Sequence, residues 1–140
     1  MLKIKDLSVR FGHNEVISEL SFIVSEGQWL MLCGPNGAGK STLVNAIAQS
    51  IPYQGNILWR DNDLSRMNAR KIARHIGVLS QKNSVSYDFT VEEVVALGRY
   101  SHTKGILNRN HDNTSAFVEN AMKLCGLENL AGRSTLTLSG

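Results

Sequence analysis

Apolar and polar residues alternate at the start of the chain. Apolar side chains recur at steps of two as far as Phe11, which predicts a half-buried strand that begins near Ile4 and ends at a turn over residues 12–14. The same alternation over residues 20–24 predicts a second strand. Because each strand has one apolar and one polar face, we expect the two to form an antiparallel sheet with one face in water.

A continuous apolar run over residues 28–33 breaks this alternation. A short apolar run between glycines is typical of a strand buried on both faces, as in a parallel sheet covered by helices. Residues 56–59 and 76–79 predict two further short strands, the first followed by a turn over residues 61–63. We expect core positions for the cysteine and the two tryptophans inside these segments, Trp29, Cys33 and Trp59.

Helical spacing follows the first apolar run. Leu43, Ala46 and Ile47 share one face of a helix that we expect to extend to about residue 50. Residues 67–75 carry helix-forming residues with basic side chains on a side that faces water. These two segments therefore predict helices between the expected strands.

Two more helices are expected in the second half of the chain. Thr90 and Glu93 fit a capping box at the start of a helix that should end near Gly98. Residues 99–113 hold few apolar side chains and predict a loop, after which a last helix stops at Gly126. The expected apolar face of that last helix consists of Phe117, Val118, Ala121, Met122 and Cys125.

The composition limits the class of protein. The 140 residues are 42% hydrophobic and 19% charged, which suits one folded domain and argues against a disordered chain. A net charge of +3 is too small to indicate a nucleic-acid partner. No apolar run approaches the ~20 residues of a membrane helix, and no secretory signal opens the chain, so we expect a cytoplasmic protein without membrane insertion. The histidines are scattered, and we expect no metal site built from them: His13, His75, His102 and His111.

The strongest chemical signal is the segment Gly-Pro-Asn-Gly-Ala-Gly-Lys-Ser-Thr at residues 34–42. It fits the phosphate-loop pattern of Gly, four residues and Gly-Lys-Ser, between an expected strand and an expected helix. The glycines let backbone amides turn inward around phosphate oxygens, and the helix start adds its positive end. Lys40 can reach the β and γ phosphates, and Ser41 can ligate Mg²⁺. The predicted ATP contacts are Gly34, Asn36, Gly37, Ala38, Gly39, Lys40, Ser41 and Thr42.

A glycine-rich turn without a ligand is the plain alternative for this segment. A strand-to-helix turn rarely needs three glycines, a lysine and a hydroxyl in this order. The Gly-x-Gly-x-x-Gly spacing of a dinucleotide-binding loop is absent around it. The segment therefore predicts the binding of a nucleoside triphosphate.

Residues on either side of the loop resemble an ABC transporter ATP-binding subunit. Phe11, in Leu-Ser-Val-Arg-Phe-Gly, stands where that family places an aromatic ring against adenine, whereas alternation alone would make it a core residue. Gln81 is similar to the family's glutamine loop, which implies a catalytic role beside Lys40 and a contact with Mg²⁺. Leu-Ser-Gly at the end of the chain resembles the start of the signature motif. This resemblance implies that Ser139 and Gly140 face the ATP of a partner subunit.

The resemblance also implies a fold. It is an α/β fold of the P-loop NTPase type in its ABC ATPase form, with an antiparallel β subdomain, a parallel core sheet with helices and a helical subdomain. We expect the β subdomain and the core within about residues 1–81, and the helical subdomain within about residues 82–140. The chain would then be an incomplete nucleotide-binding domain whose C-terminal strands are missing.

Residues 88–102 resemble the corresponding segment in importers of iron–siderophore complexes, haem and vitamin B12, because they contain a Gly-Arg-aromatic-x-His stretch. A capped surface helix with a polar loop is the alternative interpretation. The resemblance implies a homodimer of ATPase subunits at the cytoplasmic face of the membrane. Transmembrane permease subunits would dock on this dimer. A substrate-binding protein would associate with the dimer through those permease subunits.

Hydrolysis in this family needs three further groups: the Walker B aspartate, an adjacent glutamate and a switch histidine. All of them follow the signature motif. We therefore expect these 140 residues to bind MgATP without hydrolysing it, whereas the full-length dimer would be an ATPase. The alternatives are an ABC ATPase of an exporter or of a non-transport process, and a nucleotide-binding module that does not turn over.

Overall fold

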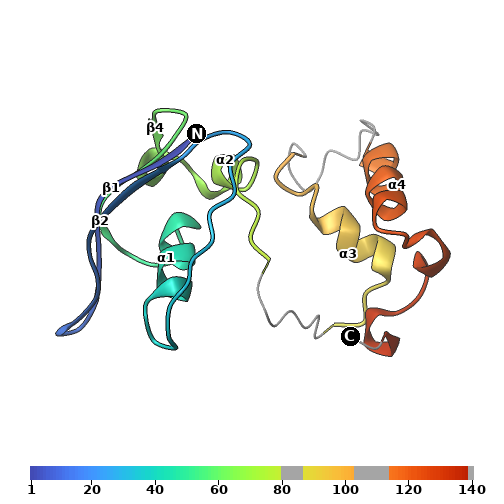
Figure 1. Ribbon diagram of the computed structural model, residues 1–140. Helices are drawn as coiled ribbons and strands as arrows, with labels where there is room; N and C mark the ends of the chain where they lie inside the picture. The colour runs from blue at the N-terminus through green and yellow to red at the C-terminus, as the bar shows by residue number, and fades with distance from the viewer. Residues whose placement is uncertain (80–86, 103–113, 139–140) are drawn as a thin grey trace. The chain divides into compact units, whose positions relative to one another are not determined.

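The computed structural model describes residues 1–79, 87–102 and 114–138 of the chain (Figure 1). The chain divides into two compact units, Met1–Ile76 and Gly77–Gly140. Each unit has a hydrophobic core of its own. We describe the two units separately.

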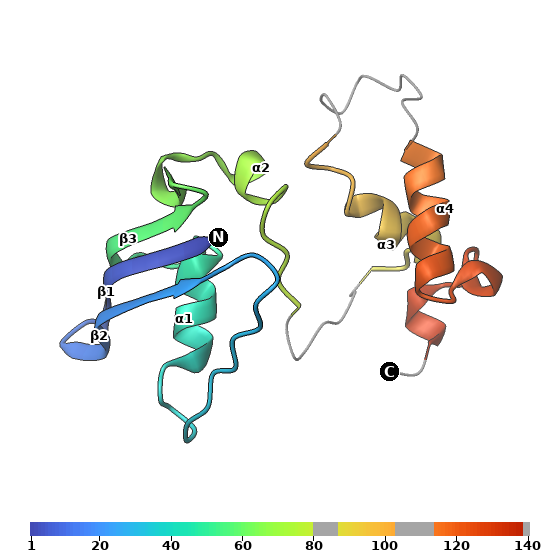
Figure 2. The same cartoon turned by 45° about the horizontal axis from the view of Figure 1, so that its top comes forward.

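The first unit is built on a four-stranded antiparallel sheet (Figures 1 and 2). Its strands are β1 (Leu2–Phe11), β2 (Asn14–Val24), β3 (Gln54–Trp59) and the short β4 (Asn62–Asp63), in the spatial order β2-β1-β3-β4. The β1–β2 hairpin confirms the alternating pattern, because Ile4, Leu7 and Val9 of β1 lie in the core while Lys5, Asp6 and Arg10 are exposed; Ser8, between two core residues, is buried as well. The turn after β3 lies one residue earlier than expected, so that Asn62 and Asp63 pair back onto that strand.

One helix covers a face of this sheet. Helix α1 (Lys40–Ile47) buries Leu43 and Ala46 against the strands and ends before the expected residue 50. Helix α2 (Ala69–Ile72) is shorter than the expected segment 67–75. Asn68 is its N-cap, and the Asn68 side chain accepts a hydrogen bond from the Lys71 amide. The core of the unit consists of Ile4, Leu7, Val9, Ile17, Leu43, Ala46, Ile57 and Leu64.

Backbone irregularities bring β1 and β3 into close approach near one end of the sheet. Gly55 has φ of +91°, and a Cβ there would lie 2.3 Å from the carbonyl oxygen of Asp6. Asp6 itself has φ of +48° at a register shift in β1, where its amide donates to the Ser21 hydroxyl at 2.7 Å. Glycine is therefore the residue that this junction requires at position 55.

The expected strand over residues 28–33 is wrong for the part of the chain that the structure describes. The segment has no regular secondary structure and pairs with none of the described strands, and Trp29 is 100% exposed. Cys33 is also exposed rather than buried. The apolar pattern of this segment predicted a burial that the structure does not show, and a strand also needs a neighbour for its backbone hydrogen bonds. The parallel core sheet is consequently not present among the described residues.

Two other sequence predictions, for residues 76–79 and for Trp59, also differ from the structure. Residues 76–79 form no strand, and Leu79 is exposed, again without a described strand beside it. Trp59 lies in β3 as expected, but it is half-buried at the edge of the core, with the Arg60 guanidinium 5.7 Å from its ring centroid. The ring is therefore covered partly by the core and partly by the side chain that follows it.

The second unit packs two helices against a short irregular segment. Helix α3 (Val91–Leu97) begins at the expected capping box: Glu93 accepts from the Thr90 amide at 2.8 Å, and Thr90 accepts from the Glu93 amide. Helix α4 (Thr114–Leu124) precedes the 3₁₀ turns η2 (Glu128–Leu130) and η3 (Thr135–Thr137). Val91, Val118 and Met122 form the core.

The apolar face expected for the last helix is only partly buried. Val118 and Met122 are core residues, whereas Phe117 and Cys125 are exposed. The Arg99 guanidinium lies 4.0 Å from the Phe117 ring centroid, so this ring is covered by a cation on one side instead of being buried among apolar groups. Five apolar residues at helical spacing form a wider face on α4 than α3 and η2 cover. Some residues of that face therefore stay exposed.

Candidate nucleotide-binding site

The glycine-rich loop leads directly into helix α1. Gly39 is the N-cap of α1, with φ of +82°, and its carbonyl oxygen accepts the first helical hydrogen bond from the Leu43 amide at 2.8 Å. Lys40 is the first helical residue, followed by the hydroxyls of Ser41 and Thr42. The loop therefore presents free amides at the positive end of a helix, which is an arrangement that binds anions.

Close approach to β2 makes a side chain at Gly39 unfavourable. A Cβ at that position would lie 3.2 Å from both Cγ1 and the carbonyl oxygen of Val16, and 3.3 Å from Cγ1 of Ile17. The left-handed φ adds strain for any other residue. Glycine here lets the loop lie against β2 while its amides remain accessible.

The lysine folds back over its own loop. Lys40 Nζ donates hydrogen bonds to the carbonyl oxygens of Gly34 and Pro35, each at 2.7 Å. Pro35 also accepts from the Ala38 amide at 3.3 Å, which closes the turn. The ammonium group is thus held at the centre of the loop, where it adds a full charge to the partial charges of the helix start.

A cavity of about 290 Å³ borders the loop on the side of β2. Strand β2 contributes mainly apolar side chains to its walls, with Ser18 as the exception, and Lys40 lines it from the start of α1. Ser41 is exposed and Thr42 is half-buried beside it at the start of α1. The residues that line the cavity include Val16, Ile17, Leu20, Cys33, Gly39 and Lys40.

Phe11 is the last residue of β1, next to the hairpin turn. Its side chain is 52% exposed, which is inconsistent with a core position. The ring is therefore available to a planar ligand, as a stacking residue must be. Gln81, Ser139 and Gly140 lie outside the described residues.

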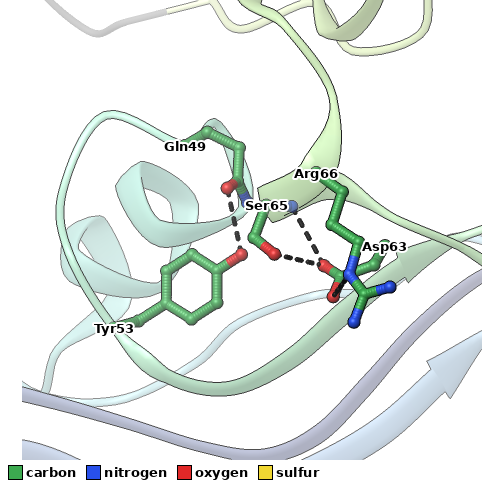
Figure 3. Close-up of polar contacts among 5 residues, drawn as sticks. All are labelled: Gln49, Tyr53, Asp63, Ser65 and Arg66. Carbon is green, nitrogen blue, oxygen red and sulfur yellow. Dashed lines mark hydrogen bonds and ion pairs between the residues drawn. The ribbon is translucent and has the colours of Figure 1, made fainter.

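A polar cluster that the sequence did not reveal follows helix α1 (Figure 3). The Tyr53 hydroxyl donates to Oε1 of Gln49 at 3.0 Å, and Oδ1 of Asp63 accepts from the Ser65 amide and hydroxyl at 3.0 and 2.8 Å. Burial is the main cause that raises the pKa of Tyr53; the hydrogen bond to Gln49 opposes it and the Asp63 charge adds to it. Of these residues, only Asp63 could be recognised from the sequence, because a carboxylate two residues before a serine is typical of a helix N-cap.

No helix in ranges 1–79, 87–102 and 114–138 is long and apolar enough to cross a membrane. In the same ranges no three His, Cys, Asp or Glu side chains gather in a way that could hold a metal ion. The glycine-rich loop that opens helix α1 with a lysine and two hydroxyls defines the class of this protein as a P-loop nucleotide-binding protein.

The chain belongs to the ABC transporter family. The family model described as "ABC transporter" matches residues 17–140, which include the phosphate loop, α3 and α4. The family resemblance inferred from the motifs is therefore confirmed.

Curated proteins that are named as import ATP-binding proteins align with nearly the whole chain. A "Hemin import ATP-binding protein HmuV" from Pseudomonas fluorescens Pf-5 is 37% identical over 141 residues, which span 100% of this chain and 53% of that protein. A "Cobalamin import ATP-binding protein BtuD" from Halobacterium salinarum is 33% identical over 140 residues, which span 99% of this chain and 34% of that protein. The chain spans about half the length of most of the curated relatives that it matches.

Solved structures share the fold. The "ATP binding subunit of ABC transporter" superposes with a TM-score of 0.80 at 22% identity, over 99% of this chain and 55% of the other. The structure of cbiO1 from Clostridium perfringens, described as part of the ABC transporter complex cbiONQ, gives a TM-score of 0.76 at 24% identity. The chain thus has the fold of the N-terminal portion of an ABC ATPase.

Proposed function

We propose that this chain is the ATP-binding portion of an ABC transporter ATPase subunit. The observation that carries the proposal is the phosphate loop itself, in which Lys40 is held over the loop at the start of α1. Family membership supports the same function, since the matched region includes the loop. ATP is the proposed ligand, and Mg²⁺ its companion ion.

Each residue of the site has a proposed role. Backbone amides of residues 34–39 cradle the phosphates, and Lys40 leaves its two carbonyl acceptors to bind the β and γ phosphates. The Ser41 hydroxyl ligates Mg²⁺, and Thr42 reaches the α phosphate. The half-exposed ring of Phe11 stacks on adenine. Asn36 and Ala38 contribute through the turn that they form between the glycines.

The proposed catalytic contribution of this chain is positioning and charge stabilisation, which dominate phosphoryl transfer. We propose that Gln81 reaches Mg²⁺ and the attacking water, and that Ser139 and Gly140 contact the ATP of a partner subunit. Since relatives such as HmuV extend well beyond the matched region, hydrolysis is proposed for a longer protein. The 140 residues alone are proposed to bind MgATP without turnover.

The transported substrate is proposed from the relatives' names. Hemin import and cobalamin import proteins cover the whole chain at 33–38% identity, which supports import of an iron–siderophore, haem or similar chelate. The proposed assembly has two ATPase subunits at the cytoplasmic face of the membrane, with permease subunits that receive a substrate-binding protein. Recognition of the chelate belongs to those partners and not to the ATPase.

The test is nucleotide-dependent stabilisation of the parent chain against Lys40→Ala. At one hundred times its Kd, MgATP should stabilise the parent by about 2.7 kcal/mol. Lys40→Ala should lose most of this gain, because the loop then lacks its full positive charge. Lys5→Ala, which removes an exposed lysine from β1, is the matched control and should respond like the parent. An unchanged melting temperature of the parent in MgATP would contradict the proposal.

A further inference from the structure

A second cavity lies wholly within the unit of residues 77–140. It has a volume of about 190 Å³ and is formed where the start of α3 and the middle of α4 meet the turn η2. This volume is below the roughly 300–1,000 Å³ of sites for drug-sized molecules, so it suits a single side chain. The residues that line it are Glu92, Val118, Glu119, Met122, Glu128 and Ala131.

The floor of this pocket is apolar and the rim is acidic. Val118 and Met122 are 4% and 3% exposed and form part of the core, so the floor is rigid. Glu92, Glu119 and Glu128 are exposed and come from three different elements, α3, α4 and η2. An apolar floor under a ring of carboxylates is complementary to a long side chain with an aliphatic stem and a cationic end.

The three carboxylates have no partner among the residues that the structure describes. None of them forms a hydrogen bond or ion pair there, even though Lys123 follows Glu119 by one turn of α4. The positive ends of α3 and η2 account for acidic residues at Glu92 and Glu128. They do not account for Glu119, in the middle of a helix. The rim therefore carries three exposed carboxylates without an ion-pair partner among the described residues, in a chain whose net charge is +3.

We propose that this pocket receives an arginine side chain from a partner protein, with the stem over Val118 and Met122 and the guanidinium between the glutamates. Arginine fits better than lysine because its planar fork donates to several carboxylate oxygens at once. Nucleic acid and anionic lipid are excluded as partners by the sign of the rim charge. The inference does not involve nucleotide, so it can fail while the proposed ATP binding holds.

The test uses n-butylguanidinium as the probe and n-butylurea, its neutral near-isostere, as the control. We expect n-butylguanidinium to shift the backbone amide resonances of Glu92, Met122 and Glu128 in the ¹⁵N-labelled protein. The affinity should fall as salt is added. In the double variant E119Q/E128Q the affinity should drop by about three-fold per charge removed, as for exposed ion pairs. Glu19→Gln, an exposed carboxylate on β2, is the matched control and should bind like the parent.

Three outcomes would overturn the proposal. The first is equal binding of n-butylurea, which would make the pocket merely apolar. The second is unchanged affinity in E119Q/E128Q with the fold intact by far-ultraviolet circular dichroism. The third is no shift at these amides, as expected if a basic residue of the chain itself occupies the pocket.

Discussion

Lys40 Nζ lies 2.7 Å from the carbonyl oxygen of Gly34, six residues before it. With its second bond, to Pro35, this contact ties the start of α1 to the start of the phosphate loop. The lysine therefore stabilises the shape of the loop as well as supplying its charge. A phosphate that attracts the ammonium group must replace these two charge-assisted hydrogen bonds.

Removing the ammonium group should loosen the loop even without nucleotide. In Lys40→Met we expect faster hydrogen exchange at the Ala38 amide, which donates to Pro35 within the same turn. Lys5→Met, with a similar loss of charge on β1, should leave that exchange rate unchanged. Equal protection of Ala38 in all three proteins would show that the two lysine contacts do not hold the loop.

Gly55→Ala should destabilise the first unit strongly. The new methyl group would lie 2.3 Å from the Asp6 carbonyl oxygen, at a backbone with φ of +91°. We expect a loss of about 1–3 kcal/mol from the backbone conformation alone, with the clash in addition, in urea denaturation. Gly77→Ala is the control, since that glycine has no atom within 4 Å of the new methyl and no positive φ. Gly77→Ala should lose no more than ~0.5 kcal/mol of unfolding free energy. A loss in Gly55→Ala that is no larger would contradict the predicted strain at Gly55.

Tyr53 should make the stability of the first unit fall at alkaline pH. Burial raises the pKa of its hydroxyl above the ordinary value of 10.0, so the unfolded chain ionises first as the pH increases. The contribution is complete below pH 10 and is lost as the pH rises through the folded pKa. We expect Tyr53→Phe to lose this part of the pH dependence, measured as free energy of unfolding between about pH 8 and pH 11. Parallel curves for the two proteins would refute the assignment.

Trp29→Gln should change the free energy of unfolding of this chain by less than about 0.5 kcal/mol, because the ring is fully exposed. Binding of a hydrophobic dye should decrease, since an exposed indole is lost from an apolar segment. Trp59→Phe is the contrasting variant and should lower stability, because that ring packs against the core. A marked loss of stability in Trp29→Gln would mean that its ring is packed after all.

Local patterns predicted the features that depend on neighbours close in the sequence. The β1–β2 hairpin, the capping box at Thr90 and the phosphate loop with its helix all follow from spacing within a few residues. The buried strand expected at residues 28–33 depended on a strand partner elsewhere in the fold, which no local pattern supplies. The positive φ of Asp6 and its contact with Gly55 likewise arise from the pairing of strands distant in sequence.

The candidate site divides in the same way. Lys40 and its glycines were identified from order and spacing alone, and the structure places them together. The exposure of Phe11 could not be foreseen, since alternation gives the same signal for an inward ring and for one at the end of a hairpin. The acidic pocket joins Glu92, Glu119 and Glu128 across three elements, and only tertiary packing makes them neighbours.

The two hydrophobic cores share no residue: one is centred on Ile4, Leu7 and Ile57, the other on Val91, Val118 and Met122. A chain with two such centres can melt in two transitions, so one melting temperature does not describe its energetics. Nucleotide bound at Lys40 would contact the first unit directly, and the second unit only through the proposed contact of Gln81 with Mg²⁺. Calorimetry should then show one transition that moves strongly with MgATP beside a second that moves less, so that each unit's response to nucleotide can be measured against the other.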